Sequence, residues 1–160
     1  MGYYIRAFCA SDKKPTILQV IEHINGLGYE FTTYTILNEE ELSTDTWTSF
    51  ELFYKADKLP IIIECNHIDD EDGLAKEEIE EFIEELGPAG FFASKKKKVI
   101  QHLQSSKYII TNQLATSDFD DLGYDANGEF LKYFVANYGG LIHADGEGFY
   151  EGTNLIIKTN

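Results

Sequence analysis

Apolar and polar positions along the chain follow two different periods, and each period predicts a different kind of element. Dense or alternating apolar runs predict strands, whereas apolar residues three or four positions apart predict helices. The predicted helices cover residues 15–27, 75–86, 94–103 and 130–138, and an acidic loop is predicted at 38–45. The predicted strands cover residues 3–10, 29–37, 47–55, 59–67, 108–115, 141–150 (broken at its glycines) and 154–158.

This order of elements predicts an α+β fold in which a mixed, mainly antiparallel sheet carries its helices on one face. The length of 160 residues fits a single domain, 1–160. A weak internal repeat indicates half-repeats at 1–67 and 107–160, joined by a helical segment at 68–106. A tandem βαβ-type (ferredoxin-like) duplication would explain the repeat, but any two strand–helix–strand segments that end at glycine also look alike.

Composition narrows the classes of partner. The chain carries 28 acidic and 13 basic residues, which gives a formal net charge of −15. Nucleic acids and anionic membranes attract basic surfaces, so we expect neither as a partner and expect a basic protein instead. Two cysteines without a regular spacing, Cys9 and Cys65, and an N-terminus unlike a secretory leader are typical of a cytoplasmic protein. The oligomeric state stays open.

Carboxylates are concentrated near the middle of the chain, where ten of the seventeen residues in 69–85 are acidic. Such a surface is either simply solvated or a landing site for a basic partner. We expect the lysines of 95–98 to pair with it across a helical hairpin. The leading hypothesis is a non-enzymatic protein-binding module, for example an immunity- or inhibitor-type protein. Its binding residues would be Glu77, Glu78, Glu81, Glu84 and Glu85.

Polar residues inside apolar strands need an explanation, because buried polar groups require partners. Arg6 and Glu64 are expected to form a structural ion pair. The alternative is a ligand pocket on an uncovered face of the sheet. The candidate pocket residues are Arg6, Glu64, Asn112, His143 and Asp145.

The segment 118–129 partly matches a calcium-binding EF-hand loop. It has glycine at the sixth position, but Leu122 at the fifth position lacks a side-chain oxygen. The competing interpretation is that its acidic residues cap turns and the start of a helix. Calcium is the leading candidate, another divalent ion at this cluster is the alternative, and no other cofactor is expected. The candidate ligands are Asp118, Asp120, Asp121 and Glu129.

The sequence contains no glycine-rich phosphate loop, no nucleophile elbow and no histidine spacing typical of a metal centre. The alternative to the leading hypothesis is a small enzyme or ligand-binding domain. It would use the acidic segment 118–129 and the strand that carries His143 and Asp145. Salt-sensitive capture of a basic protein would favour the leading hypothesis, and a pocket at these elements would favour the alternative.

Overall fold

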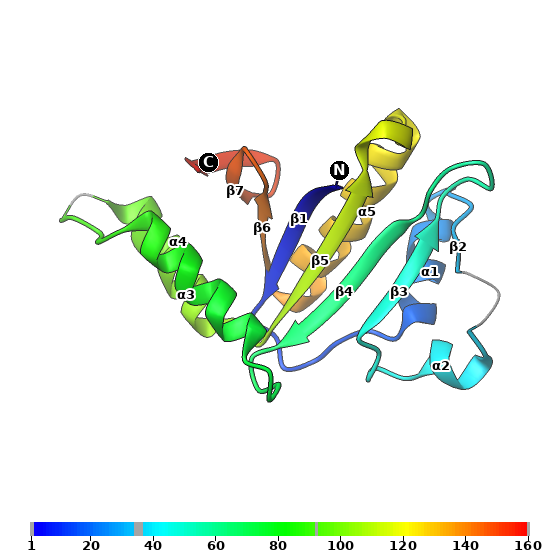
Figure 1. Ribbon diagram of the computed structural model, residues 1–160, viewed down its shortest axis with the longest axis horizontal. Helices are drawn as coiled ribbons and strands as arrows, with labels where there is room; N and C mark the ends of the chain where they lie inside the picture. The colour runs from blue at the N-terminus through cyan, green and yellow to red at the C-terminus, as the bar shows by residue number, and fades with distance from the viewer. Residues whose placement is uncertain (1, 34–36, 92, 160) are drawn as a thin grey trace.

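The computed structural model describes residues 2–33, 37–91 and 93–159, and in these residues the chain forms an α+β fold on an eight-stranded sheet (Figure 1). Each strand pairs antiparallel with its neighbours, in the order β2-β3-β4-β5-β1-β6-β7-β8. The predicted α+β class and the mainly antiparallel sheet are confirmed. The strands are β1 (Gly2–Cys9), β2 (Thr32–Thr33), β3 (Ser49–Phe53), β4 (Ile61–His67), β5 (Tyr108–Ala115), β6 (Gly140–Ala144), β7 (Gly148–Glu151) and β8 (Asn154–Lys158).

The helices cover both faces of the sheet, whereas the sequence predicted one face. The alternation along β1 shows why: Ala7 and Cys9 are buried in one core and Phe8 in a second core on the opposite side. A central strand that is apolar on both faces needs cover on both. Helices α1 (Ile17–Gly26) and α5 (Asp121–Tyr138) lie behind the sheet in Figure 1. Helices α3 (Leu74–Leu86) and α4 (Ser94–Ser105) form a hairpin at the left.

Side-chain caps decide where several helices begin. Thr16 and Gln19 form a reciprocal capping box at the start of α1, and Asn38 and Glu41 form another. The second box starts the short helix α2 (Glu39–Ser43), so the predicted acidic loop at 38–45 is largely helical. Capping boxes satisfy backbone N–H groups that the first helical turn leaves unpaired. Local chemistry therefore overrides the polar composition that suggested a loop.

Most predicted strands agree with the structure, and the clearest difference is at the edge strand β2. Of the strand predicted at 29–37, residues 34–36 lie outside the described residues, and only Thr32–Thr33 is assigned to β2.

Cys9 and Cys65 are both buried and form no disulfide. Burial raises the pKa of the Cys65 thiol to about 11, so it stays protonated. Within the described residues, no helix has the length and apolar character needed to cross a lipid bilayer.

The predicted half-repeats 1–67 and 107–160 both contribute to the same continuous sheet. Their innermost strands, β1 and β5, pair with each other along their whole length, from Gly2 opposite Ala115 to Cys9 opposite Tyr108. The strands that follow the first helix of each half occupy different places, since β2 lies at the outer edge and β6 pairs with β1. The duplication stays a prediction.

Candidate functional site

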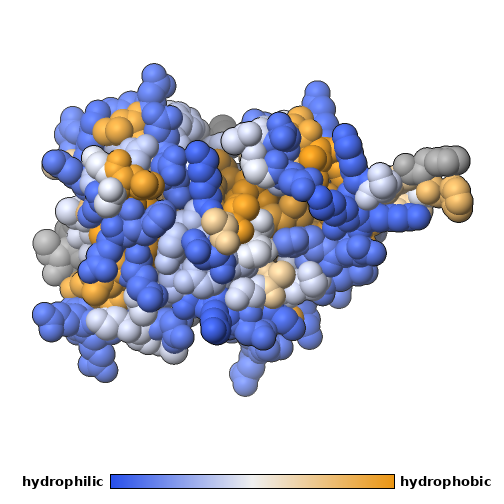
Figure 2. All heavy atoms as spheres, turned by 180° about the vertical axis from the view of Figure 1, so that it is seen from behind, coloured by the Kyte–Doolittle hydropathy of each residue, from blue (hydrophilic) through white to orange (hydrophobic). Residues whose placement is uncertain are grey.

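A cavity of about 670 Å³ opens on the face of the sheet that carries α5. Pockets for small molecules typically have volumes of about 300–1,000 Å³, so this one is large enough for a ligand. In Figure 2, which shows this face of the molecule, apolar residues gather in a hollow near its centre. The apolar lining residues are Ile5, Leu131, Val135, Ala136, Ile142 and Ala144.

The walls of the cavity come mainly from β1, α5 and β6, and β1 is distant in sequence from the other two. Ile5 of β1 lies opposite Ala144 of β6 in the sheet, which places both side chains on the same floor. The wall above is α5, which ends at Gly139 in the left-handed region, with φ of 62°. The chain then turns directly into β6, where a Cβ on Gly140 would come within 3.2 Å of the Phe134 backbone. This tight corner sets α5 and β6 side by side.

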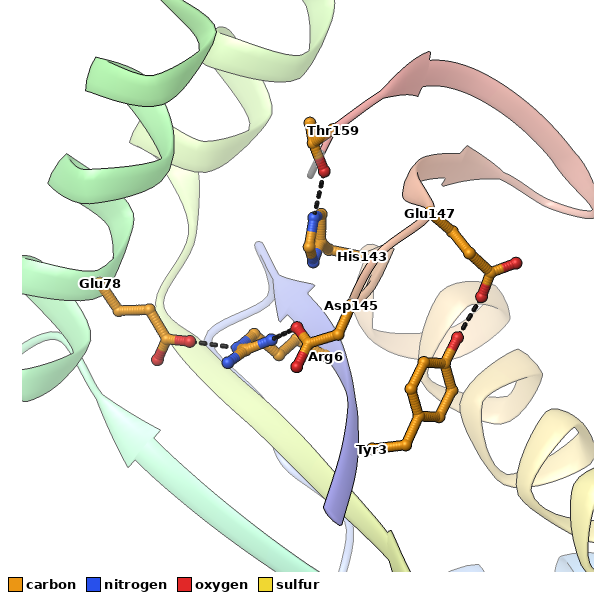
Figure 3. A network of polar contacts seen from close by, with 7 residues as sticks. All are labelled: Tyr3, Arg6, Glu78, His143, Asp145, Glu147 and Thr159. Atoms are coloured by element: carbon orange, nitrogen blue, oxygen red, sulfur yellow. Dashed lines mark hydrogen bonds and ion pairs between the residues drawn. The ribbon is translucent and has the colours of Figure 1, made fainter. Parts of the chain in front are cut away.

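A carboxylate stands at the rim of the cavity with two phenols. Glu147 accepts hydrogen bonds from the hydroxyl groups of Tyr3 and Tyr150, the latter at 2.8 Å (Figure 3 shows Tyr3 and Glu147). Burial, together with the hydrogen bond to Glu147, raises the pKa of Tyr3 above its ordinary value. The same carboxylate raises the pKa of Tyr150 through its hydrogen bond. Both phenols are therefore held as protonated donors, and they fix the position of Glu147.

A pair of buried amides lies beneath the cavity. The side chain of Asn112, on β5, is fully buried, and its Nδ2 donates to Oδ1 of Asn127 at 2.7 Å. Asn127 is 2% exposed and lines the cavity from α5. Asn112, predicted as a pocket residue, does not itself line the cavity. It binds the side chain of Asn127, which does. Asn127 was not among the predicted site residues.

The predicted ion pair between Arg6 and Glu64 is not formed. Arg6 instead pairs with Glu78 through Nε and with Asp145 through Nη1, the latter at 2.7 Å (Figure 3). Thr111 of β5 is opposite both Arg6 and Glu64, so a whole strand separates them in the sheet. Helix α3 crosses this face and brings Glu78 closer. Glu64 is exposed on the part of the sheet that the helices leave open.

The charge balance around Arg6 favours the ion pairs. Burial lowers the pKa of the guanidinium, but the charges of Glu78 and Asp145 outweigh that effect and raise it. The Arg6 side chain is 16% exposed, while the two carboxylates are 24% and 40% exposed. Arg6 therefore ties α3 to the β6–β7 turn through a partly desolvated cluster.

His143 lies beside this cluster in an apolar setting. Its ring centroid is 4.5 Å from that of Phe82 and 4.7 Å from that of Phe149, and the side chain is 2% exposed. Nε2 is 2.8 Å from the Thr159 hydroxyl, and Nδ1 has no partner among the described residues. Burial, followed by the charge of Arg6, lowers the pKa of His143 to about 4. The imidazole is neutral at pH 7.

The structure brings three of the five predicted pocket residues together. Arg6, His143 and Asp145 lie on the face that α3 covers, and Glu64 lies apart on the open part of that face. Asn112 faces the opposite core, beside α5. These five residues do not surround one space. The large cavity is instead on the α5 side of the same strands.

The segment 118–129 is not a loop, because α5 begins at Asp121 after a single 3₁₀ turn at Thr116–Asp118. Asp120 caps α5 by accepting from the Gly123 N–H at 3.0 Å, and it pairs with Lys55 at 2.6 Å. Asp118 accepts from the Leu59 N–H at 2.8 Å. Glu129 pairs with Lys132 one helical turn further on. The described residues contain no cluster of three side chains suited to a metal ion.

The acidic side of α3 is exposed as its sequence indicates, with one exception. Glu78 turns inward to Arg6, while the other four predicted binding residues face solvent. Helices α3 and α4 pack as the expected hairpin (Figure 1). The ion pairs of the described residues include none between the two helices, and Lys98 pairs with Glu151 of β7 instead. The four exposed residues are Glu77, Glu81, Glu84 and Glu85.

The cavity was not predicted, although one of its walls left a pattern in the sequence. Phe130 and Phe134 form the core stripe of α5, and both are fully buried. Leu131 and Val135 repeat at the same spacing one position later, so the apolar stripe is wider than a single contact requires. That extra width could have indicated a second apolar surface on α5.

Comparison with protein families, with curated proteins and with solved structures finds no match to this chain. We therefore infer its function from the geometry of the cavity and of the charged surfaces.

Proposed function

We propose that this protein binds a small, mainly apolar molecule in the cavity between α5, β1 and β6. The observation that carries the proposal is a space of about 670 Å³ whose exposed wall surface is largely apolar. Removing apolar ligand surface from water contributes about 25 cal/mol per Å², so burial against such walls favours binding. Polar groups at one side, including Glu147 and Tyr150, give the ligand a defined orientation.

This proposal develops the alternative hypothesis of a ligand-binding domain. The segment 118–129 supplies Tyr124, Asn127 and Gly128 to the cavity. The strand of His143 supplies its neighbours Ile142 and Ala144, because successive residues of a strand point to opposite faces. The elements named by the sequence thus meet at the cavity, although different side chains line it.

Replacing Ala136 with tryptophan is expected to weaken binding of Nile red, a neutral apolar dye, at least tenfold. Ala136 lines the cavity at its exposed side, so an indole there occupies ligand space without displacing the core. The measurement is dye fluorescence at increasing protein concentration. The matched control is Asn137→Trp, which adds the same ring at the next exposed position of α5, outside the cavity lining. Failure of the unaltered protein to bind the dye, or equal weakening by both variants, would contradict the proposal.

A second candidate function is association with a basic protein through the exposed face of α3. The observation that favours it is that Glu77, Glu81, Glu84 and Glu85 face solvent without an ion-pair partner among the described residues. An unneutralised field of this kind speeds association with an oppositely charged surface. An immunity- or inhibitor-type role is the concrete form of this candidate.

Changing these four glutamates of α3 together to glutamine is expected to abolish salt-sensitive capture of a basic partner. Attraction between exposed charges is screened at high salt, so capture by the unaltered protein should also weaken as salt increases. The measurement is recovery of bound protein at low and high salt. A matched control neutralises four other exposed glutamates, Glu22, Glu30, Glu39 and Glu40. Equal loss in both variants would show that net charge acts, and not the α3 face.

A further inference from the structure

We infer that the cavity selects an apolar molecule that carries a neutral carbonyl oxygen, which accepts a hydrogen bond from Nδ2 of Asn127. The inference rests on the proposed function and adds the chemical class of the ligand. The amide pair beneath the cavity is the observation behind it, because the described residues supply hydrogen-bond partners to only some of the polar atoms of the two side chains.

The hydrogen bond between the two amides uses one group of each. Asn112 contributes its nitrogen and Asn127 its oxygen, at 2.7 Å. The nitrogen and oxygen of an amide lie on opposite sides of the same carbon, so fixing the oxygen of Asn127 toward Asn112 turns its nitrogen away. In the hydrogen bonds of the described residues, Asn127 takes part through this oxygen and not through its nitrogen. Asn127 lines the cavity, so this donor is available to a molecule bound there.

Packing alone does not explain two asparagines at this place. Asn112 is fully buried, and its Oδ1 has no donor among the described residues. Its partners across the sheet are the apolar residues Ile5 and Ile63. A half-satisfied buried polar pair is less stable than apolar residues of the same shape. Ligand binding explains the pair, because the pair holds a hydrogen-bond donor at the floor of the cavity.

The charges around the cavity disfavour an anion, and the donor at Asn127 favours an acceptor over an ammonium group at that point. Glu147 lies at the rim, and the chain as a whole has a formal net charge of −15, so a carboxylate ligand meets repulsion. Lys132 also lines the cavity, but it is already paired with Glu129. An ammonium group has no acceptor at Asn127, which presents a donor. A ketone, ester or amide oxygen meets no such conflict.

The rest of the ligand is expected to be aliphatic. Leu131 and Val135 approach from α5, and Ile142 lies across from them on β6. These side chains offer contact area and no hydrogen bonds. A carbonyl near one end of a hydrocarbon chain would place its oxygen at Asn127 and its chain along these residues.

The inference is tested with four compounds of matched chain length: a methyl ketone, a carboxylic acid, a primary amine and a hydrocarbon. Each competes with Nile red for the full-length protein. We expect the ketone to bind about tenfold more tightly than the hydrocarbon and more tightly than the acid or the amine, because one well-formed hydrogen bond distinguishes it from the hydrocarbon.

The key variant is the double substitution Asn112→Val with Asn127→Leu. It removes both amides, so neither partner is left unpaired in the core. The expected result is that the preference disappears: within this variant the ketone and the hydrocarbon bind equally tightly. The control Asn137→Leu removes an exposed amide from the same helix, outside the cavity lining, and should keep the preference.

The outcomes separate the two claims. A ketone preference that survives in the double variant, equal binding of ketone and hydrocarbon, or tighter binding of the acid or amine would overturn the inference and leave the cavity as a ligand site. Absence of binding by Nile red and by all four compounds would overturn the proposed function, and the inference with it.

Discussion

Replacing Arg6 with methionine is expected to lower the free energy of unfolding by about 2–3 kcal/mol. The change leaves the carboxylates of Glu78 and Asp145 without their cation in a partly desolvated place. Removing one partner of a fully buried pair costs about 3–5 kcal/mol, and we expect less here because both carboxylates retain some contact with water. The measurement is urea unfolding at pH 7, compared with the unaltered protein.

Two controls separate the ion-pair cluster from a general effect of losing a charge. Lys55→Met removes an exposed cation that pairs with Asp120, and surface pairs contribute about 1 kcal/mol or less. Adding Glu78→Leu to the Arg6→Met variant removes one of the orphaned carboxylates and should recover part of the stability. Unchanged stability of the Arg6→Met protein would show that the cluster does not tie α3 to the sheet.

The free energy of unfolding is also expected to fall as the pH is lowered from 6.5 to 4, with His143 alone accounting for about 3 kcal/mol. The pKa of this side chain is about 4 in the folded protein and near its ordinary 6.5 when unfolded. Between these two pH values the unfolded chain binds a proton that the folded chain excludes. Protonation therefore stabilises the unfolded state, progressively from pH 6.5 downward, and the effect is complete below pH 4.

The cause of this acid sensitivity is the apolar packing of the ring, followed by the positive charge of Arg6. Asp145 and Glu147 act in the opposite direction and do not compensate. The control is His143→Phe, which keeps a ring between Phe82 and Phe149 and cannot titrate. The difference in stability between the two proteins should change by about 3 kcal/mol across this pH range. Parallel loss of stability in both would contradict the buried, neutral state of His143.

Local sequence chemistry accounts for most element boundaries and for the errors at two of them. The strand predicted at 108–115 is the observed β5, because apolar residues at both of its ends indicate a strand although Asn112 and Gln113 interrupt them. The segment 38–45 was predicted as a loop from its polar composition, and 118–129 as an acidic loop that either binds calcium or caps turns and the start of a helix. Asn38 and Asp120 cap helices there. A cap is itself a sequence feature, so the helix at 38–45 was predictable, and the cap at Asp120 agrees with the capping interpretation of 118–129.

The candidate sites show what periodicity leaves undecided. The sequence named Arg6 as a charge that needs a partner, and it named the wrong partner. Strand order decided this, since Thr111 lies between Arg6 and Glu64 in the sheet, and the placement of α3 supplied Glu78. Neither strand order nor helix placement is encoded in the local pattern of any one segment.

The sequence by itself determined the α+β class, the span of most strands and helices, and the exposure of the acidic side of α3. Each of these depends on residues within a few positions of one another, where side-chain period, caps and glycines act directly. Only the tertiary structure decided that helices cover both faces, that Arg6 meets Glu78 and Asp145, and that a cavity opens beside Asn127. The rim contact of Tyr3 with Glu147 joins residues 144 positions apart. Such a contact exists only once the sheet has brought the two ends of the chain together.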